Sequence, residues 1–158
     1  MPLQEELGYP FPVKAAPHEA LMNILYTGTL LAKEGYKILR PHGLTDSQFN
    51  LLMLLKYQSD EDVGLTQTEL GSMLLVNRSN VTGLIDRLEH SGWVERSGQA
   101  NDRRVKRIRL TKKGRQKLES AEEVYYRRVT EIMGALSEKE QKQLTRLLEK
   151  VRERIASE

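Results

Sequence analysis

Residues 93–117 combine a concentrated positive charge with the spacing of two short β-strands, and this combination restricts the fold more than any other part of the chain. The segment holds ten Lys or Arg residues against two acidic residues, a local charge of +8, whereas the whole chain of 158 residues carries only +3. By subtraction, the remaining 133 residues sum to about −5. Solubility does not require such concentration, and a polyanionic partner would explain it.

The composition is typical of one mainly helical domain. At 158 residues the chain is long enough for one domain with a hydrophobic core, or for a small domain with an oligomerisation arm. It contains no cysteine, which excludes disulfides, cysteine-ligated zinc and a thiol redox switch. No window of about 18 residues is apolar throughout, and no secretory signal is recognisable, so we expect a cytoplasmic protein.

The N-terminal part of the chain predicts an extended arm followed by a helix. Four of the five prolines fall within residues 1–17, where they favour extended backbone. The aromatic residues Tyr9 and Phe11 suggest that this arm docks on another surface. An apolar stripe then predicts a helix over residues 18–39, ended by the proline and glycine that follow it.

Three capping boxes mark the starts of further helices. In each, a Thr or Ser side chain and a Gln or Glu three residues later satisfy free N–H groups at a helix start. The pairs are Thr45 with Gln48, Thr66 with Glu69, and Ser137 with Glu140. The helices expected from these starts and from apolar spacing cover residues 46–57, which should lie in the core, 66–74, 111–133, and a last segment after residue 137.

A helix over residues 77–91, with Asn77 as its N-cap, has two contrasting faces. Its predicted core face is Val81, Leu84, Ile85 and Leu88, one helical stripe. The opposite face carries small polar groups, which suit a helix lying deep in a DNA major groove. Gly83 lies on that face and costs about 1 kcal/mol relative to alanine. It is either a tolerated surface glycine or a point of close approach to another molecule.

After this helix, residues 93–97 and 105–110 predict two strands joined by a long tip. Side chains alternate across a strand, so Lys106 should point to one face and Arg107 and Arg109 to the other. The basic run is therefore divided between a hairpin and the start of the next helix. About half of its cations are expected to contact a nucleic-acid backbone or to contribute only to the local field.

Residues 68–114 closely resemble the winged helix–turn–helix of the MarR (multiple-antibiotic-resistance regulator) family. The most specific match is Asp102-Arg103-Arg104 followed by the segment Leu110-Thr111-x-x-Gly114. A second match runs over residues 81–96, and the helix plan agrees over residues 18–156. Leu75 departs from the family, which usually has glycine there. Gly83 departs too, because a larger or basic residue is common at that position.

The resemblance implies a mainly α fold with a small β-hairpin wing. It implies an N-terminal arm over residues 1–17, a DNA-binding region over 45–114, and dimerisation helices over 18–44 and 115–158. The expected function is a homodimeric regulator of transcription that binds double-stranded DNA at a palindromic operator, most simply a ligand-relieved repressor. The alternatives are a winged-helix module that binds protein and an architectural DNA-binding protein without sequence preference.

The resemblance also assigns DNA-contacting residues. In the family the wing places an arginine in the minor groove, which implies Arg104 here, with Arg103 on a phosphate and Asp102 as an orienting partner. The recognition-helix residues expected at the DNA are Asn77, Arg78, Ser79, Asn80, Thr82, Gly83 and Arg87. The wing residues expected there are Asp102, Arg103, Arg104 and Lys106.

Two further surfaces are expected. The terminal helices carry more apolar surface than a winged domain can cover, which favours a dimer over an intramolecular bundle. This apolar surface includes Leu118 and Ala121. The residues expected at the dimer interface are Leu21, Ile24, Leu144, Leu147, Leu148, Val151 and Ile155. Family members often bind small aromatic or phenolic effectors. The candidates for such a site are Tyr26, Tyr36, Arg40, His42, Phe49 and Met53.

Catalysis and cofactor binding are not expected. The three histidines lie far apart in the sequence, and no cysteine accompanies them, so a metal site would need unrelated helices. The sequence shows no Ser/His/Asp arrangement and no Gly-rich phosphate loop. We therefore expect neither an enzyme nor a cofactor.

Overall fold

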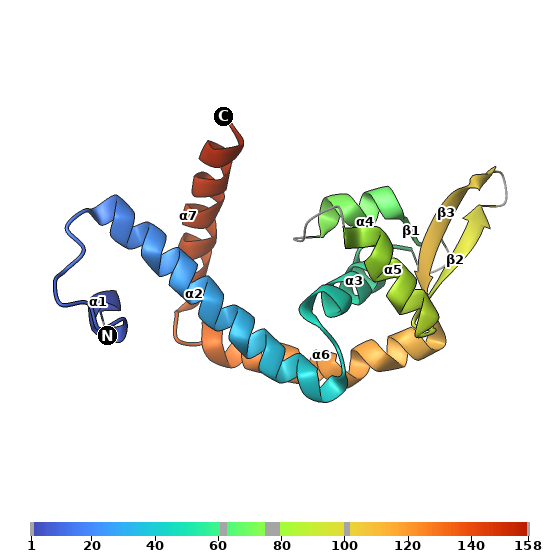
Figure 1. Ribbon diagram of the computed structural model, residues 1–158, viewed down its shortest axis with the longest axis horizontal. Helices are drawn as coiled ribbons and strands as arrows, with labels where there is room; N and C mark the ends of the chain where they lie inside the picture. Colours follow the sequence, from blue (N-terminus) through green and yellow to red (C-terminus); the bar gives the residue numbers. More distant parts are fainter. Residues whose placement is uncertain (1, 61–62, 75–79, 100–101, 158) are drawn as a thin grey trace.

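In chain order, a small sheet and three helices lie between long helices. In space they form one end of the molecule (Figure 1). The computed structural model describes residues 2–60, 63–74, 80–99 and 102–157. Among them no helix has the length and apolar character that a membrane crossing requires. The elements are α1 (Leu3–Glu6), α2 (Ala16–Leu39), the 3-10 helix η1 (Arg40–His42), α3 (Asp46–Tyr57), β1 (Leu65–Thr66), α4 (Gln67–Met73), α5 (Val81–His90), β2 (Val94–Gln99), β3 (Asp102–Leu110), α6 (Lys112–Met133) and α7 (Glu138–Ala156).

The three predicted capping boxes are confirmed. Thr45 opens α3, Thr66 opens α4 and Ser137 opens α7, each with both reciprocal hydrogen bonds present. At α3, the Thr45 N–H donates to Gln48 Oε1 over 2.9 Å, and the Gln48 N–H donates to Thr45 Oγ1 over 3.3 Å. Local side-chain chemistry therefore defines these helix starts independently of tertiary packing.

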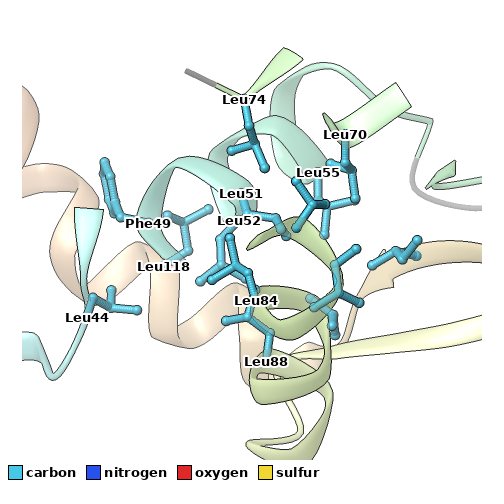
Figure 2. Packing of buried hydrophobic residues seen from close by; sticks show 14 of the residues in the cluster. Leu44, Phe49, Leu51, Leu52, Leu55, Leu70, Leu74, Leu84, Leu88 and Leu118 are labelled. Atoms are coloured by element: carbon cyan, nitrogen blue, oxygen red, sulfur yellow. The ribbon is translucent and has the colours of Figure 1, made fainter. Parts of the chain in front are cut away.

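The hydrophobic core is built around α3 and the inner face of α5, as expected (Figure 2). Leucine side chains from α3, α4, α5 and α6 meet there. The buried residues of α3 and α5 are Phe49, Leu51, Leu52, Leu55, Val81, Leu84, Ile85 and Leu88. Leu118 and Ala121 of α6 are also fully buried in this core, so their assignment to the apolar surface left for a dimer is wrong.

The sheet has the antiparallel order β1-β3-β2, with Val94 opposite Leu110 and Leu65 opposite Ile108. Two features differ from the prediction. The hairpin strands extend to Gln99 and Asp102, so most of the predicted long tip is strand. The two-residue strand β1 was not predicted, because so short a segment has no periodicity. The hairpin of β2 and β3, here called the wing, projects beyond the helices (Figure 1).

The N-terminal arm is only partly extended. It contains the short helix α1, whose Leu3 is buried, and α2 begins at Ala16, ahead of the prediction. Pro17 lies in the first turn of α2, where its missing N–H removes no intrahelical bond. The side chain of Phe11 is 77% exposed, so in this single chain its aromatic ring has no docking surface.

The start of α6 packs unusually close to the start of β2. A Cβ added at Gly114 would collide with the carbonyl oxygen of Trp93. Thr111 caps α6 by accepting from the Gly114 N–H (2.9 Å), and its hydroxyl donates to the Gly92 carbonyl (2.7 Å). The Thr111 N–H also donates to the Trp93 carbonyl (3.1 Å). The Leu-Thr-x-x-Gly motif thus joins the wing to α6.

A buried charge joins α3 to α6. The Glu122 carboxylate accepts from Lys56 Nζ (2.5 Å) and from the Tyr57 hydroxyl, both at the end of α3. Burial raises the pKa of Glu122, but the hydrogen bonds from Lys56 and Tyr57 outweigh it, so the pKa lies below its ordinary value. The hydrogen bond to Glu122 raises the pKa of Lys56. Both groups therefore remain charged at neutral pH.

We predict that Gly114→Ala destabilises the protein by about 1–3 kcal/mol, because α6 and β2 must separate to admit a methyl group. Urea unfolding followed by circular dichroism would measure the change. Gly71→Ala is a matched control, since its Cβ would lie 3.8 Å from Val81 Cγ2, an ordinary contact. Equal stability of the two variants would contradict the close-approach explanation.

The Glu122 interaction predicts a pH dependence of stability. Its folded-state pKa is lowered from 4.5, so its contribution is present above that pH and is lost as the pH falls through the folded-state pKa. In urea titrations below about pH 4.5, the free energy of unfolding should therefore fall more steeply for the native chain than for Glu122→Gln. The exposed neighbour Glu123 provides the control, and Glu123→Gln should keep the native slope. Identical slopes for all three proteins would refute the interaction.

Candidate nucleic-acid interface

The outward face of α5 is small, polar and exposed. Asn80, Thr82 and Arg87 are exposed, and Gly83 is half-buried between them. The Thr82 hydroxyl accepts from Gln67 Nε2 over 2.6 Å, which joins α5 to the start of α4. The helix was predicted from residue 77, but α5 begins at Val81 with Asn80 as its N-cap residue. Asn77, Arg78 and Ser79, also expected at the DNA, lie outside the described residues. The described part of the helix therefore presents Asn80, Thr82, Gly83 and Arg87 together on one surface.

Arg96 of β2 binds two acidic residues of α5. Its Nη2 lies 2.5 Å from Asp86 Oδ1, its Nη1 contacts Glu89, and its backbone N–H donates to Glu89 Oε1 over 3.2 Å. The hydrogen bond to Asp86 raises the pKa of Arg96, so the guanidinium stays charged. The wing is thereby joined to α5, and the single positive charge of Arg96 offsets part of the negative charge of Asp86 and Glu89.

Among the described side chains of residues 93–117, five basic residues have identified contacts within the chain. Besides Arg96, two are arginines of β3: Arg107 lies 3.6 Å from Glu69 and 3.1 Å from the Gly64 carbonyl, and Arg109 lies 3.3 Å from Glu95. The other two are lysines of α6: Lys113 lies 2.9 Å from the Ser91 carbonyl, and Lys117 lies 5.1 Å from the Trp93 ring centre. Lys106 is exposed, whereas Arg107 and Arg109 are half-buried. These contacts hold the five cations within the chain, and Lys106 remains exposed on the wing.

The predicted wing residues Asp102, Arg103 and Arg104 lie at the start of β3, at the far end of the wing. Their side chains are outside the described part of the structure. Gln99 pairs with Asp102, with a register shift between Gly98 and Gln99. The backbone alone therefore brings the Asp-Arg-Arg motif to the outer end of the hairpin, while Lys106 continues the same strand toward α6.

Comparison with known proteins identifies the family. The MarR family model matches residues 44–106. The transcriptional repressor MprA of Escherichia coli (strain K12) is 32% identical over 119 residues, which are 75% of this chain and 66% of MprA, just under two thirds of its length. The transcriptional repressor YetL of Bacillus subtilis (strain 168) is 31% identical over 114 residues, covering 72% of this chain and 67% of YetL. The chain belongs to the MarR family.

Solved structures of transcription regulators share the fold of this MarR family protein. The organohalide-sensing regulator RdhR-CbdbA1625 in its 2,4-dichlorophenol-bound form matches 92% of this chain and 87% of its own, with a TM-score of 0.76 and 19% identity. MepR of S. aureus in a DNA complex matches 89% of this chain and 99% of its own, with a TM-score of 0.77 and 22% identity. The predicted winged-helix fold is thus confirmed. The expectation of a regulator, not an enzyme, agrees with the relatives MprA and YetL.

Two of the cavities that adjoin α6 in this MarR family protein are lined by its tyrosines. One, of about 270 Å³, lies between α3, the end of α4 and α6, and is lined by Asn50, Met53, Leu54, Tyr57, Gln58, Met73, Leu74 and Tyr126. The other, of about 240 Å³, lies between α2 and α6, and its lining includes Leu31, Ile38, Tyr125 and Ile132. At the second cavity, Arg128 Nη2 pairs with Glu34 Oε2 over 3.1 Å.

The six residues expected at an effector site do not share one cavity. Met53 lines the first cavity, whereas Phe49 is buried in the core with its ring 4.8 Å from that of Tyr125. Tyr36 is exposed and lies 5.9 Å from the Arg40 guanidinium. Tyr26 lies ten residues before Tyr36 on α2, about 15 Å along the helix axis. His42 is half-buried in η1.

The histidines remain apart in space as well as in sequence. His18 begins α2, His42 lies in η1 and His90 ends α5. Within the described ranges, no group of three or more His, Asp or Glu side chains converges where a metal ion could bind.

The apolar faces of α2 and α7 are largely uncovered. The α7 helix leaves the end of α6 and projects away from the winged part (Figure 1). Leu148 is half-buried, while the other interface residues predicted from the sequence are at least 39% exposed: Leu21, Ile24, Leu144, Leu147, Val151 and Ile155. Leu25, Leu30 and Leu31 of α2 add to this surface. One chain thus exposes more contiguous apolar helix surface than a stable monomer usually does.

Proposed function

We propose that this MarR family protein is a sequence-specific DNA-binding regulator of transcription, a repressor that acts as a homodimer on a palindromic operator and responds to a small aromatic ligand. The observation that carries the proposal is the partition of charge around α5. Arg96 pairs with both acids of the recognition helix and offsets part of their charge, and the outer end of the wing retains the Asp-Arg-Arg motif, followed along β3 by an exposed Lys106.

The proposed DNA contacts follow from this arrangement. A helix with a small polar face fits the major groove, where base edges expose donors and acceptors. The outer end of the wing would then reach the neighbouring minor groove, in which Arg104 is the proposed inserted side chain. Asn77, Arg78 and Ser79 complete the proposed contact set. The DNA complex of MepR supports this assignment, because that protein has the same fold.

The proposed dimer uses the uncovered surface of α2 and α7. A single recognition helix reads few base pairs, so two-fold dimers on half-sites about 10 base pairs apart are the usual solution for helix–turn–helix proteins. Burying the exposed leucines of both helices would also remove the apolar surface that the single chain leaves in water. We assign the domains accordingly, with residues 45–114 at the DNA and residues 18–44 and 115–158 in the dimer.

The proposed effector site is the cavity between α3, α4 and α6. Its aromatic and methionine lining suits an aromatic ligand, and Asn50, Gln58 and Tyr57, which belongs to the adjacent ion-pair network, provide polar groups. The dichlorophenol-bound form of RdhR-CbdbA1625 shows that a regulator of this fold binds a phenolic compound. Of the residues predicted from sequence, Met53 belongs to this site.

A winged-helix module that binds an acidic protein is the second candidate, because its wing would also be basic. An architectural DNA-binding protein is the third. Selection of bound duplexes from a random pool separates the three. A regulator enriches a palindrome, an architectural protein binds without enrichment, and a protein-binding module retains no duplex. The last two outcomes would each overturn the proposal.

Replacing Arg104 by alanine should weaken operator binding by more than about 1 kcal/mol, because a charged minor-groove contact is lost. The fold and the dimer should be unaffected. Fluorescence anisotropy over a series of salt concentrations would measure both the affinity and the salt slope. Arg127→Ala, at an exposed position of α6, removes the same charge far from the wing and should match the native protein. Native affinity in Arg104→Ala would remove this residue from the interface.

Leu147→Asp should convert the dimer into monomers, because it places a charge in the apolar surface proposed as the dimer interface. The side chain is 54% exposed in the single chain, so the substitution should leave the core intact. Sedimentation velocity would report the oligomeric state, and circular dichroism the fold. Arg146→Ala makes the same change of charge on the polar face of α7 and should remain dimeric. A dimeric Leu147→Asp would move the interface elsewhere.

A further inference from the structure

The fold does not explain the glycine at position 83. Its backbone is not in the left-handed region, and a Cβ added there would lie 3.5 Å from Arg87 Nη1 and 3.7 Å from Asn80 Oδ1. Both are ordinary van der Waals distances, so alanine fits within the chain. Alanine would also favour the helix over glycine. The contrast with Gly114, where a Cβ collides with backbone, indicates that Gly83 is suited to something outside the chain.

Asn80, Gly83 and Arg87 place two polar side chains around a glycine on one face of the helix. Asn80, the N-cap residue of α5, precedes Gly83 by three residues and Arg87 by seven. Helical side chains lean toward the N-terminus, which carries the Arg87 guanidinium back over Gly83. The nitrogen of Arg87 and the amide oxygen of Asn80 therefore border the same point above the glycine.

The Arg87 guanidinium is available to a partner. Among the described residues, none forms a hydrogen bond or ion pair with it, and its side chain is exposed. Asp86 and Glu89 are the acidic residues nearest in the helix, and both bind Arg96 instead. The Arg96 interactions thus leave Arg87 as a donor group beside the Asn80 acceptor.

This set of groups matches one base pair. In the major groove a G·C pair presents the acceptors N7 and O6 on guanine and the donor N4–H₂ on cytosine. A guanidinium can donate to both guanine acceptors, while an amide oxygen can accept from the cytosine amino group. An A·T pair presents an amino donor in place of the guanine O6, so bidentate binding by arginine is lost.

We infer that Asn80, Gly83 and Arg87 read a single G·C base pair in each half of the operator. Arg87 binds guanine, Asn80 binds the paired cytosine, and Gly83 lets the base edges approach the helix backbone. The inference rests on the proposed function and gives it a specific base preference. Replacing this G·C pair by A·T should weaken binding by about fivefold to 150-fold.

The first test uses the operator enriched by the native protein, which should contain one invariant G·C pair in each half-site. Arg87→Lys keeps the charge but cannot bind guanine through a planar fork. This variant should lose most of the preference for G·C over A·T, while its affinity for random duplex and its salt slope stay near native values. Arg127→Lys, at an exposed position of α6, is the matched control and should keep the full preference.

The second test separates DNA contact from helix stability. Gly83→Ala should raise the midpoint of thermal unfolding by about 2–4 °C, because the helix is favoured. It should nevertheless weaken operator binding at least fivefold, since the methyl group occupies the space above position 83 that the base edges would enter. A merely tolerated surface glycine would give the same thermal shift with native operator affinity, and that result would overturn the role of Gly83.

The remaining outcomes distinguish the two proposals. An enriched operator whose G·C preference persists in Arg87→Lys would overturn the base readout and leave the regulator intact. Failure of the native protein to enrich any duplex would overturn the proposed function, and the readout with it.

Discussion

The close approach of α6 to the start of β2 is the constraint on which the rest of the molecule depends. Gly114 and the Trp93 carbonyl can meet only because position 114 lacks a side chain, and Thr111 bonds both segments at that point. From there α6 runs under the core, burying Leu118 and Ala121, and continues to the uncovered apolar helices. One helix thus connects the wing, the core of the winged domain and the apolar arms.

The Glu122 network joins α6 to the end of α3 at a second point. A buried carboxylate without partners would be strongly unfavourable, so the end of α3 must stay within reach of α6 to supply Lys56 and Tyr57. The cavity proposed for an effector lies beside this junction, and Tyr57 belongs to both. In the proposed dimer, a ligand in this cavity would act at the junction between the winged part and the helical arms, which is the physical basis of the proposed ligand response.

Several cations of the basic run neutralise acidic side chains of the same chain. The basic run suggested a polyanion, but Arg96, Arg107 and Arg109 bind acids within the chain. The sequence predicted the alternation of Lys106 with its neighbours because that depends only on strand geometry. It did not predict the Arg96 interactions with α5, because the partners are brought together by the packing of helix against sheet. The effector residues illustrate the same limit, since six positions proposed from residue type are distributed over α2, η1 and α3.

The sequence by itself determined the helices, their capping boxes and the core face of α5, because hydrophobic spacing and local hydrogen bonds act over a few residues. The resemblance of residues 68–114 to a known family also identified the wing. Only the tertiary structure decided that Leu118 and Ala121 belong to the core, that α1 and β1 exist, and which cations are already paired. Those outcomes depend on contacts between residues distant in sequence, whose geometry arises only when the elements pack together.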